Sequence, residues 1–537
     1  MAFSRIIGAA GLIMLGSVLS RLMGLVRETV IAAYFGSSAA TSAFVTASTV
    51  PTMAYDLLVG GAVSAALIPV FSECAGRDDE ESLWSMASSL LGLAALVLGA
   101  AVALGVLLAP QLLWLLGVGF SPGVEREALF LTRVILPSLF FLGLAGITSA
   151  LLYARQSFVY PALSLSAYNI GIVLGAVLLS STMGVASLAV GALLGSALQL
   201  SLQMLGLGGA RLTLHIDWGH PGLQRMLRLY LPVALGLMVS QVGVIIDRNL
   251  AWRTGGESLA VMRFATTLVQ LPLGLVASAT SLAVLPTLSR AAAGAAVLSQ
   301  SVPSPIAPGE EPEVPLQEYR DTLLLGLNLS LLLVIPATAG LVLLREPVVR
   351  LLFQRGVFDE RATALTALAF LYYAPQMPFV AVDQLLIFAF YARQNTVTPV
   401  LVGVAAVCCY LVVGLGLIGP YGVFGLIAAN TVQNSLHAVV LYALLRRAIG
   451  GMREGAMLHT VSRALLATAA MAAVYLLVAP SLDRLLGLGW LGLPAYVFVA
   501  AGLSAAVYLC GLWWLGVKEM DLLRSVVFAR LRPASSR

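Results

Sequence analysis

Long apolar runs separated by short polar segments dominate this chain. A transmembrane helix needs about 20 apolar residues, and fourteen of the runs meet that length. The sequence therefore predicts an all-α polytopic membrane protein with about 14 transmembrane helices. The predicted spans, with ends good to a few residues, are 8–35, 41–72, 83–116, 127–154, 158–181, 184–208, 224–252, 258–289, 320–344, 362–391, 398–418, 421–445, 457–480 and 489–516.

Composition excludes a chain of several soluble domains. Hydrophobic residues make up 60% and charged residues 10% of the 537 residues, and the mean hydropathy is +0.96. An ordinary soluble protein carries about 25% charged residues, so this chain has too little charge to cover water-facing domains. The apolar run that follows Arg5 lacks a small-residue cleavage site and is predicted to be the first span rather than a signal peptide.

The distribution of cations predicts the orientation in the membrane. With the N-terminus in the cytoplasm, the inside segments hold more than twice as many cationic residues as the outside segments. The protein is therefore predicted to lie in the inner membrane with both termini in the cytoplasm. The net charge of +5 is spread over loops without a basic, aromatic-interleaved patch, so no nucleic-acid partner is expected. Residues 345–361 are predicted to form an amphipathic surface helix.

Two pairs of similar segments indicate an internal duplication. ALIPVFSECAG at 66–76 resembles AVLPTLSRAAAG at 283–294, offset by 217 residues, and LYARQSFVYP at 152–161 resembles FYARQNTVTP at 390–399, offset by 238. The offset grows by 21, about the length of the Pro-, Ser- and Glu-rich stretch 295–316. We interpret that stretch as a flexible linker. The duplication therefore predicts two parallel six-helix lobes, with a substrate site between them near the midplane of the membrane.

This duplication sets the predicted domain organisation. The N-lobe holds spans one to six, the C-lobe holds spans seven to twelve around the cytoplasmic linker, and two C-terminal helices belong to neither repeat. The predicted boundaries are 1–210 for the N-lobe, 211–294 and 317–450 for the two parts of the C-lobe, 295–316 for the linker, 451–517 for the last two helices and 518–537 for a cytoplasmic tail.

A few ionisable residues lie inside predicted spans, where each costs about 2.5–3.5 kcal/mol and normally faces a cavity or a partner. Arg21 and Arg27 of the first span are six residues apart and diverge by about 120° around the helix, so both can border one wide cavity. Glu28 lies on nearly the same face as Arg21 and is expected to hold it while no substrate is bound. One interpretation is a diphosphate site, because guanidinium groups bind such anions in bidentate fashion; the other is ion pairing of these arginines with Glu28 or Asp56.

The second half of the chain adds Asp247, Arg248, Arg263 and Asp383. Asp247 and Arg248 point about 100° apart on a helix and are not expected to pair with each other. Asp247 is either a carboxylate for Na⁺ or H⁺ coupling or a partner for an arginine. Asp383 is expected to pair across the C-lobe, whereas His437 is expected to be an isolated packing residue.

No pattern for covalent chemistry or metal binding is present in the sequence. The spacing of His215 and His220 is not HExxH, and the four cysteines give neither metal-ligand spacing nor a disulfide framework. No phosphate-cradling glycine loop or nucleophile elbow is found. We therefore expect a transporter rather than an enzyme, with no cofactor or metal.

Five stretches are similar to segments of a known family: SRLMGLVRETVIAAYFG, GAVSAALIPVFSE, LPLGLVASATSLAVLPTLSR, REPVVRLLFQRGVFDERAT and FYARQNTVTPV. With them the chain resembles the MviN/MurJ family of lipid II flippases, part of the multidrug/oligosaccharidyl-lipid/polysaccharide exporter superfamily. The resemblance covers essentially the whole chain. It implies fourteen helices in two lobes and a cationic cavity that binds the diphosphate and sugars of lipid II and opens to one membrane face at a time.

Several residue roles are implied by this resemblance. Arg21 and Arg27 match the two first-span arginines of the family, and Glu28 stands where an acid follows the second. Asp247 matches an acidic position of the seventh helix implicated in cation coupling. Lipid II, an undecaprenyl-diphosphate-linked muropeptide, and the bilayer are the implied partners of a chain expected to be a monomer. Coupling to Na⁺, to H⁺ or to the membrane potential stays open.

The chain also departs from the family pattern. Asp56 stands near the position of an expected second-span arginine, and Thr267 and Gln270 replace an eighth-span arginine and glutamate. Arg263 lies one turn before Thr267 on roughly the same face and is expected to supply the missing charge. The expected function is flipping of lipid II by alternating access, with Arg21, Arg27, Glu28, Asp56 and Arg263 at the substrate. The alternative is export of another polyprenyl-diphosphate-linked saccharide or an amphiphile.

Overall fold

The described part of the chain is helical and contains no strand. The computed structural model describes residues 2–60, 67, 70–71, 80–117, 121–208, 221–274, 276, 288, 313–452, 454–517 and 519. The chain divides into two compact units, Met1–Phe264 with Phe353–Ala362 (unit 1) and Ala265–Leu352 with Thr363–Arg537 (unit 2). The units are defined by contacts and the predicted lobes by the duplication, so the lobe boundaries stay predictions.

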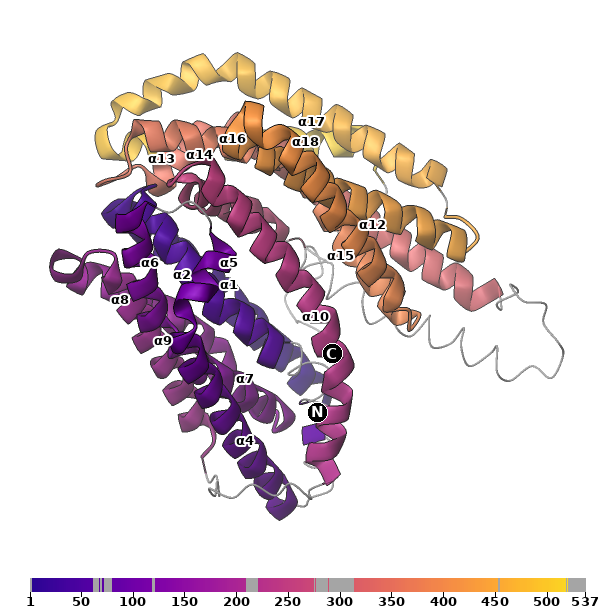
Figure 1. Ribbon diagram of the computed structural model, residues 1–537. Helices are drawn as coiled ribbons and strands as arrows, with labels where there is room; N and C mark the ends of the chain where they lie inside the picture. Colours follow the sequence, from indigo (N-terminus) through magenta and orange to yellow (C-terminus); the bar gives the residue numbers. More distant parts are fainter. Residues whose placement is uncertain are drawn as a thin grey trace. The chain divides into compact units, whose positions relative to one another are not determined.

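Unit 1 is built from the helices of the first half of the chain, coloured indigo to magenta (Figure 1). They are α1 (Ala2–Phe35), α2 (Ala39–Tyr55) with the π-helix η1 (Asp56–Gly60), α4 (Glu80–Leu107), α5 (Ala109–Leu116), α6 (Pro122–Ile135), α7 (Ser138–Ala154), α8 (Val159–Met183), α9 (Ala186–Gly206) and α10 (Pro221–Thr254). A further helix covers 258–274, and its residues up to Phe264 belong to this unit.

The second half of the chain forms the helices coloured salmon to yellow. They are α12 (Glu313–Leu343), α13 (Arg345–Phe353), α14 (Glu360–Tyr373) with the 3₁₀ turn η3 (Ala374–Gln376), α15 (Met377–Ala392), α16 (Val397–Ala448), α17 (Glu454–Leu482) with η4 (Asp483–Gly487) and η5 (Gly489–Leu491), and α18 (Gly492–Trp514).

The predicted spans agree with these helices wherever the structure describes them. Among the described residues, nine helices are long and apolar enough to cross a membrane. One of them, α16, contains two predicted spans, because Gly422 interrupts it with non-helical backbone angles (φ 55°, ψ −132°). The count of fourteen stays a prediction. The predicted linker, apart from its last residues in α12, and nearly all of the tail lie outside the described residues.

The predicted surface helix is real but shorter than expected, ending at Phe353. Its amphipathic character is confirmed, because Val349 and Phe353 are buried whereas Arg350 is exposed. Phe353 lies 5.2 Å from the ring of Phe264 and 6.0 Å from that of Phe358. These three aromatic rings form a small core within unit 1.

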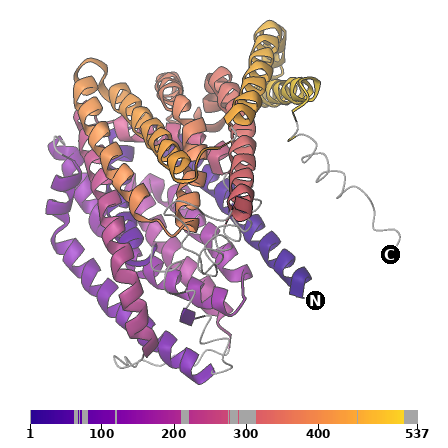
Figure 2. The same cartoon turned by 90° about the vertical axis from the view of Figure 1, so that its right-hand side faces the viewer.

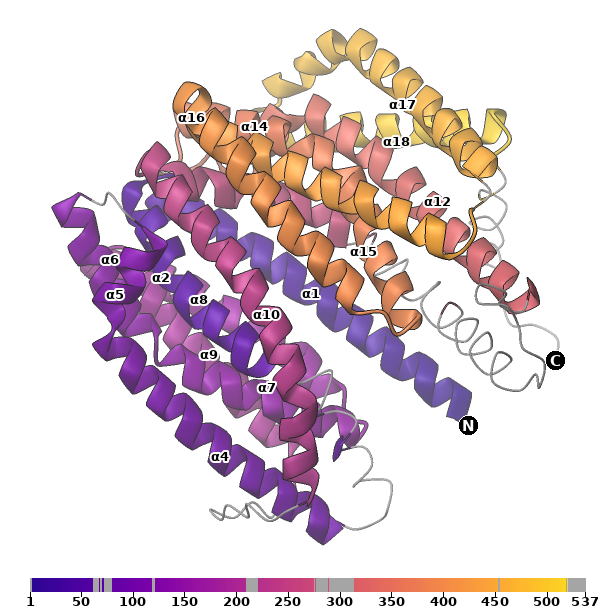
Figure 3. The same ribbon diagram turned by 45° about the vertical axis from the view of Figure 1, so that its right-hand side comes forward.

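Glycines allow α8 and α9 to lie side by side (Figures 1 and 3). A Cβ added at Gly171 would be 2.3 Å from the Cα of Gly195, and one added at Gly191 would be 2.6 Å from the carbonyl oxygen of Gly171. Membrane helices associate through such small residues because lipid gives no hydrophobic force between helices. A similar approach, at Gly16 and Ala162, joins α1 to α8.

In unit 2, the last two helices pack as a hairpin against α12 (Figure 2, yellow). Their shared core contains Leu332 of α12, Ala467 and Met471 of α17, and Tyr508 and Leu512 of α18. Tyr508 also donates a hydrogen bond to the carbonyl oxygen of Leu332 at 2.7 Å.

The internal duplication has local counterparts in both units. Gln156 and Gln394, 238 residues apart, are the only described non-glycine residues with positive φ, and both have φ 58°. Each follows an arginine stacked on an aromatic ring: Arg155 lies 5.0 Å from the ring of Trp84, and Arg393 lies 6.0 Å from that of Tyr319. Gly184 (φ 54°) and Gly422 (φ 55°) repeat at the same offset. The same turns therefore recur at an offset of 238 residues, the offset of the second pair of similar segments.

The close approach of α8 and α9 can be tested with two glycines. Gly171→Ala places a methyl group against the backbone of α9, and we expect overpacking to cost about 1–3 kcal/mol. Gly99→Ala is the matched control, because nothing lies within 4 Å of a Cβ at that position. Thermal unfolding of the purified variants should show a lower Tm for Gly171→Ala alone. An equal Tm for both would contradict this packing.

Candidate functional site

Two charged residues of α1 occupy the interior of unit 1. The Glu28 side chain is 4% exposed and that of Arg27 is 23% exposed. Arg27 donates to Glu28 Oε1 from Nε at 3.0 Å and from Nη2 at 2.6 Å. Its third nitrogen, Nη1, donates to Asn169 Oδ1 of α8 at 2.9 Å. Arg27 is therefore held in one orientation by its neighbour and by a second helix.

Arg263 reaches the same carboxylate from the helix at 258–274. Its Nε donates to Glu28 Oε2 at 2.7 Å and its Nη2 donates to Oε1 at 2.8 Å. This is the bidentate geometry in which a guanidinium binds a carboxylate most strongly. The Arg263 Cζ also lies 5.6 Å from the ring centroid of Phe44 on α2, within cation–π range.

Hydrogen bonds from α2 fix the elements around Arg263. The Ser42 hydroxyl accepts from the backbone nitrogen of Ala260 at 3.1 Å. On α10, the indole nitrogen of Trp252 donates to Thr46 Oγ1 at 2.8 Å. Ser42 and Thr46 are both fully buried. The start of the helix at 258–274 is thus tied to α2, which places Arg263 at Glu28.

We call Arg27, Glu28, Arg263 and Asn169 the charge cluster. It contains two guanidinium groups and one carboxylate, so its formal charge is +1. Burial of a single carboxylate would be costly without partners, and here both of its oxygens accept hydrogen bonds. The excess positive charge makes the cluster able to bind an anion, provided that the anion competes with Glu28.

The structure brings together three of the five predicted substrate residues. Arg21 is exposed and forms no ion pair with a described residue. The prediction that Glu28 holds Arg21 is wrong. Glu28 binds Arg27 and Arg263 instead, at 2.6 and 2.7 Å. Asp56 begins the π-helix η1, is exposed, and likewise forms no ion pair within the described residues.

Asp247 and Arg248 of α10 form an ion pair, so the prediction that these two neighbours do not pair with each other is wrong. Arg248 Nη1 lies 3.7 Å from Asp247 Oδ2, at the outer limit of an ion pair. The long arginine side chain bends back along the helix and overcomes the angular separation of the two Cβ atoms. Both side chains are about three-quarters buried, at 25% and 23% exposure.

In unit 2, Asp383 of α15 pairs with a residue of α16, in agreement with the prediction that it pairs across the C-lobe. Its partner is His437, whose Nδ1 lies 2.7 Å from Asp383 Oδ1. The expectation that His437 is isolated is therefore wrong. Asn169 and His437 were both missed as site residues because their partners, Arg27 and Asp383, lie on distant segments of the chain. Only the spacing of Asn430, Asn434 and His437 along one face could have drawn attention to the second.

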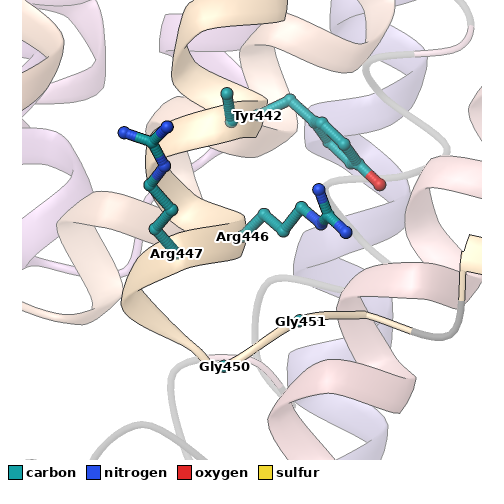
Figure 4. Close-up of a pocket in the computed structure, with 6 residues that line it drawn as sticks. Tyr442, Arg446, Arg447, Gly450 and Gly451 are labelled. Atoms are coloured by element: carbon teal, nitrogen blue, oxygen red, sulfur yellow. The ribbon is translucent and has the colours of Figure 1, made fainter.

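A pocket of about 420 Å³ lies elsewhere in unit 2, at the end of α16 (Figure 4). Tyr442, Arg446, Arg447, Gly450 and Gly451 line it. Arg446 is engaged by Glu454, with its Nη2 at 3.1 Å from Glu454 Oε2. This pocket contains none of the predicted site residues.

Comparison with known proteins identifies the family. The family model described as lipid II flippase MurJ matches residues 31–491. The chain belongs to the lipid II flippase MurJ family. The stretches that suggested this family in the sequence lie largely within the matched residues, and the multi-pass helical architecture agrees with it.

Relatives of the chain match along nearly their whole length. A probable lipid II flippase MurJ of Haemophilus influenzae is 28% identical, covering 94% of this chain and 99% of the relative. The lipid II flippase MurJ of Burkholderia cenocepacia is 26% identical, covering 80% and 82%.

Solved structures support the fold. A lipid II flippase MurJ in an inward closed conformation superposes with a TM-score of 0.74 at 22% identity, covering 97% of this chain and 99% of that one. An inward-facing multidrug resistance transporter described as a MATE family member of the MOP superfamily gives a TM-score of 0.65 at 14% identity, covering 82% of this chain and 98% of that one.

The charge cluster predicts unequal effects of one substitution at two glutamates. Glu28→Gln leaves two guanidiniums facing each other in a buried site, which we expect to cost about 3–5 kcal/mol. Glu257→Gln removes the exposed partner of Arg361 and should cost about 0–1 kcal/mol. In both cases the shortest nitrogen–oxygen distance is under 3 Å, so the two glutamates differ in burial and in the number of arginines they bind. A large fall in Tm for Glu28→Gln with little change for Glu257→Gln is expected; equal shifts would contradict it.

Proposed function

We propose that this protein flips lipid II, the lipid-linked peptidoglycan precursor, across the cytoplasmic membrane by alternating access. The observation that carries the proposal is the charge cluster, in which Arg27 and Arg263 share one carboxylate inside a chain of the lipid II flippase MurJ family. Lipid II has a diphosphate between its lipid and its sugars. A buried, net positive cluster suits that group better than any other part of the substrate.

Glu28 acts in this proposal as a stand-in for the diphosphate. While the site is empty, its carboxylate neutralises one of the two guanidiniums and lowers the cost of keeping them inside the membrane. An arriving diphosphate carries more negative charge and more acceptor oxygens than a carboxylate. It therefore replaces Glu28 as the partner of Arg27 and Arg263, and departure of the product restores the original pairs.

The remaining predicted residues keep secondary roles. Arg21 is exposed on α1 and is proposed to contact substrate where it enters or leaves, and Asp56 to limit the positive charge nearby. Asp247 is proposed to take part in cation coupling. Arg248 Nη1 lies 3.7 Å from its carboxylate. No covalent step is needed, so the protein is proposed to act as a transporter and not as an enzyme. It is proposed to work as a monomer in the inner membrane with both termini in the cytoplasm.

Complementation of a strain depleted of its own lipid II flippase tests the proposal. Wild type should restore growth and Arg27→Ala should not, because the cluster then loses half of its guanidinium groups. Arg361→Ala is the control: this arginine is 75% exposed and lies in a surface pair. Membrane levels of each variant are measured by immunoblot.

The possible outcomes separate the candidate functions. Growth with both variants would contradict the role of Arg27. No growth with a properly inserted wild type would favour export of another polyprenyl-diphosphate-linked saccharide, for which the replacements at Thr267 and Gln270 already give a reason.

A further inference from the structure

Within unit 2, a continuous row of polar contacts joins the second half of α16 to the end of α14, to η3 and to α15. Thr431 Oγ1 donates to the carbonyl oxygen of Tyr372 at 2.7 Å. Asn434 Nδ2 donates to Gln376 Oε1 at 2.6 Å. His437 Nδ1 then meets Asp383 Oδ1 at 2.7 Å. Gln376 ends η3 and Asp383 lies seven residues further on, in α15, so these contacts extend along this helical stretch over about 10 Å.

The row ends at two titratable groups that are mostly buried. The exposed fractions of the His437 and Asp383 side chains are 14% and 20%. Asp383 is the charged group that acts on the ring from α15. From the first half of α16, the ring is faced by the Pro399 carbonyl, 3.5 Å from Nε2, and by Gly403, where an added Cβ would lie 3.8 Å from that nitrogen.

Both ring nitrogens of His437 thus face acceptors. An ionised carboxylate and a backbone carbonyl accept hydrogen bonds and cannot donate them. The neutral imidazole has one N–H, whereas the imidazolium has two. Only the imidazolium can donate toward both Asp383 and Pro399. Histidine is also the side chain whose unperturbed titration falls in the physiological range.

We propose that His437 and Asp383 form a proton-binding site in unit 2. Uptake of one proton at Nε2 converts the imidazole into an imidazolium and changes the pair from a net charge of −1 to zero. Release of that proton from Nε2 reverses the change. An uncompensated charge inside a membrane protein is costly, so the two states favour different surroundings for the pair.

The position of the pair suggests what the proton does. Asp383 lies on α15, Pro399 and Gly403 on the first half of α16, and His437 beyond the Gly422 break on its second half. Protonation therefore changes contacts among three consecutive membrane helices. Proton binding at this pair then couples lipid transport to a transmembrane pH gradient, a role that rests on the proposed function.

Histidine-selective ¹⁵N NMR of the full-length protein in lipid nanodiscs tests proton binding without any transport assay. The chain has four histidines, so the His437 signal is assigned as the one lost in His437→Gln. We expect this signal to change protonation state with pH, and its midpoint to move in Asp383→Asn while the other three stay in place. The proposal is overturned by a His437 signal that keeps one protonation state at every pH measured. It is also overturned by a midpoint that is unchanged in Asp383→Asn.

Flipping of lipid II in proteoliposomes, at a clamped membrane potential, tests the coupling. The wild-type rate should change with an imposed pH gradient, and His437→Gln should lose that dependence. His459→Gln is the matched control, because His459 is exposed on α17, and it should behave as wild type. Active flipping by wild type that is insensitive to the gradient overturns the coupling. A wild type that binds the proton but flips no lipid II overturns the proposed function and leaves the proton site standing.

Discussion

The sharing of the Glu28 carboxylate by Arg27 and Arg263 is the interaction on which the account of unit 1 depends. Charges inside a membrane protein are tolerated when they are paired and hydrogen-bonded. Here four nitrogen–oxygen contacts of 2.6–3.0 Å satisfy one carboxylate from two helices. Removal of Glu28 would leave two buried guanidiniums without a counter-charge, whereas an incoming diphosphate would supply one. The same arrangement is thus stable when empty and ready for a substrate.

The surrounding fold serves to hold these groups at short range. Glycines bring α8 against α9 and against α1, so that Asn169 reaches Arg27. Buried hydroxyls of α2 anchor Ala260 and Trp252, which brings Arg263 to the carboxylate. Polar side chains that only join helices are therefore as important for the site as its charged members.

The sequence predicted much of the fold because its signals are local. Apolar runs predict membrane helices, and the repeated YARQ segments predicted the duplication that reappears in the matched backbone at Gln156 and Gln394. Three of the five predicted substrate residues meet in the charge cluster, but the prediction of which residues pair was less successful. Helical angles assigned Glu28 to Arg21, but a long arginine side chain bends toward its immediate neighbour, as both Arg27 and Arg248 do. The partners Asn169 and His437 depend on contacts between distant segments, which residue spacing does not reveal.

The most direct test of the central claim is the affinity of the purified protein for lipid II in nanodiscs. Wild type is compared with a double variant, Arg27→Ala and Arg263→Ala, and with Arg361→Ala as the surface control. Hydrogen bonds to charged groups contribute about 1.5–3 kcal/mol each, and about 1.4 kcal/mol corresponds to tenfold in Kd. The account predicts that the double variant binds lipid II at least about tenfold more weakly while the control binds as wild type. Equal affinity of all three, with the double variant folded, would contradict it.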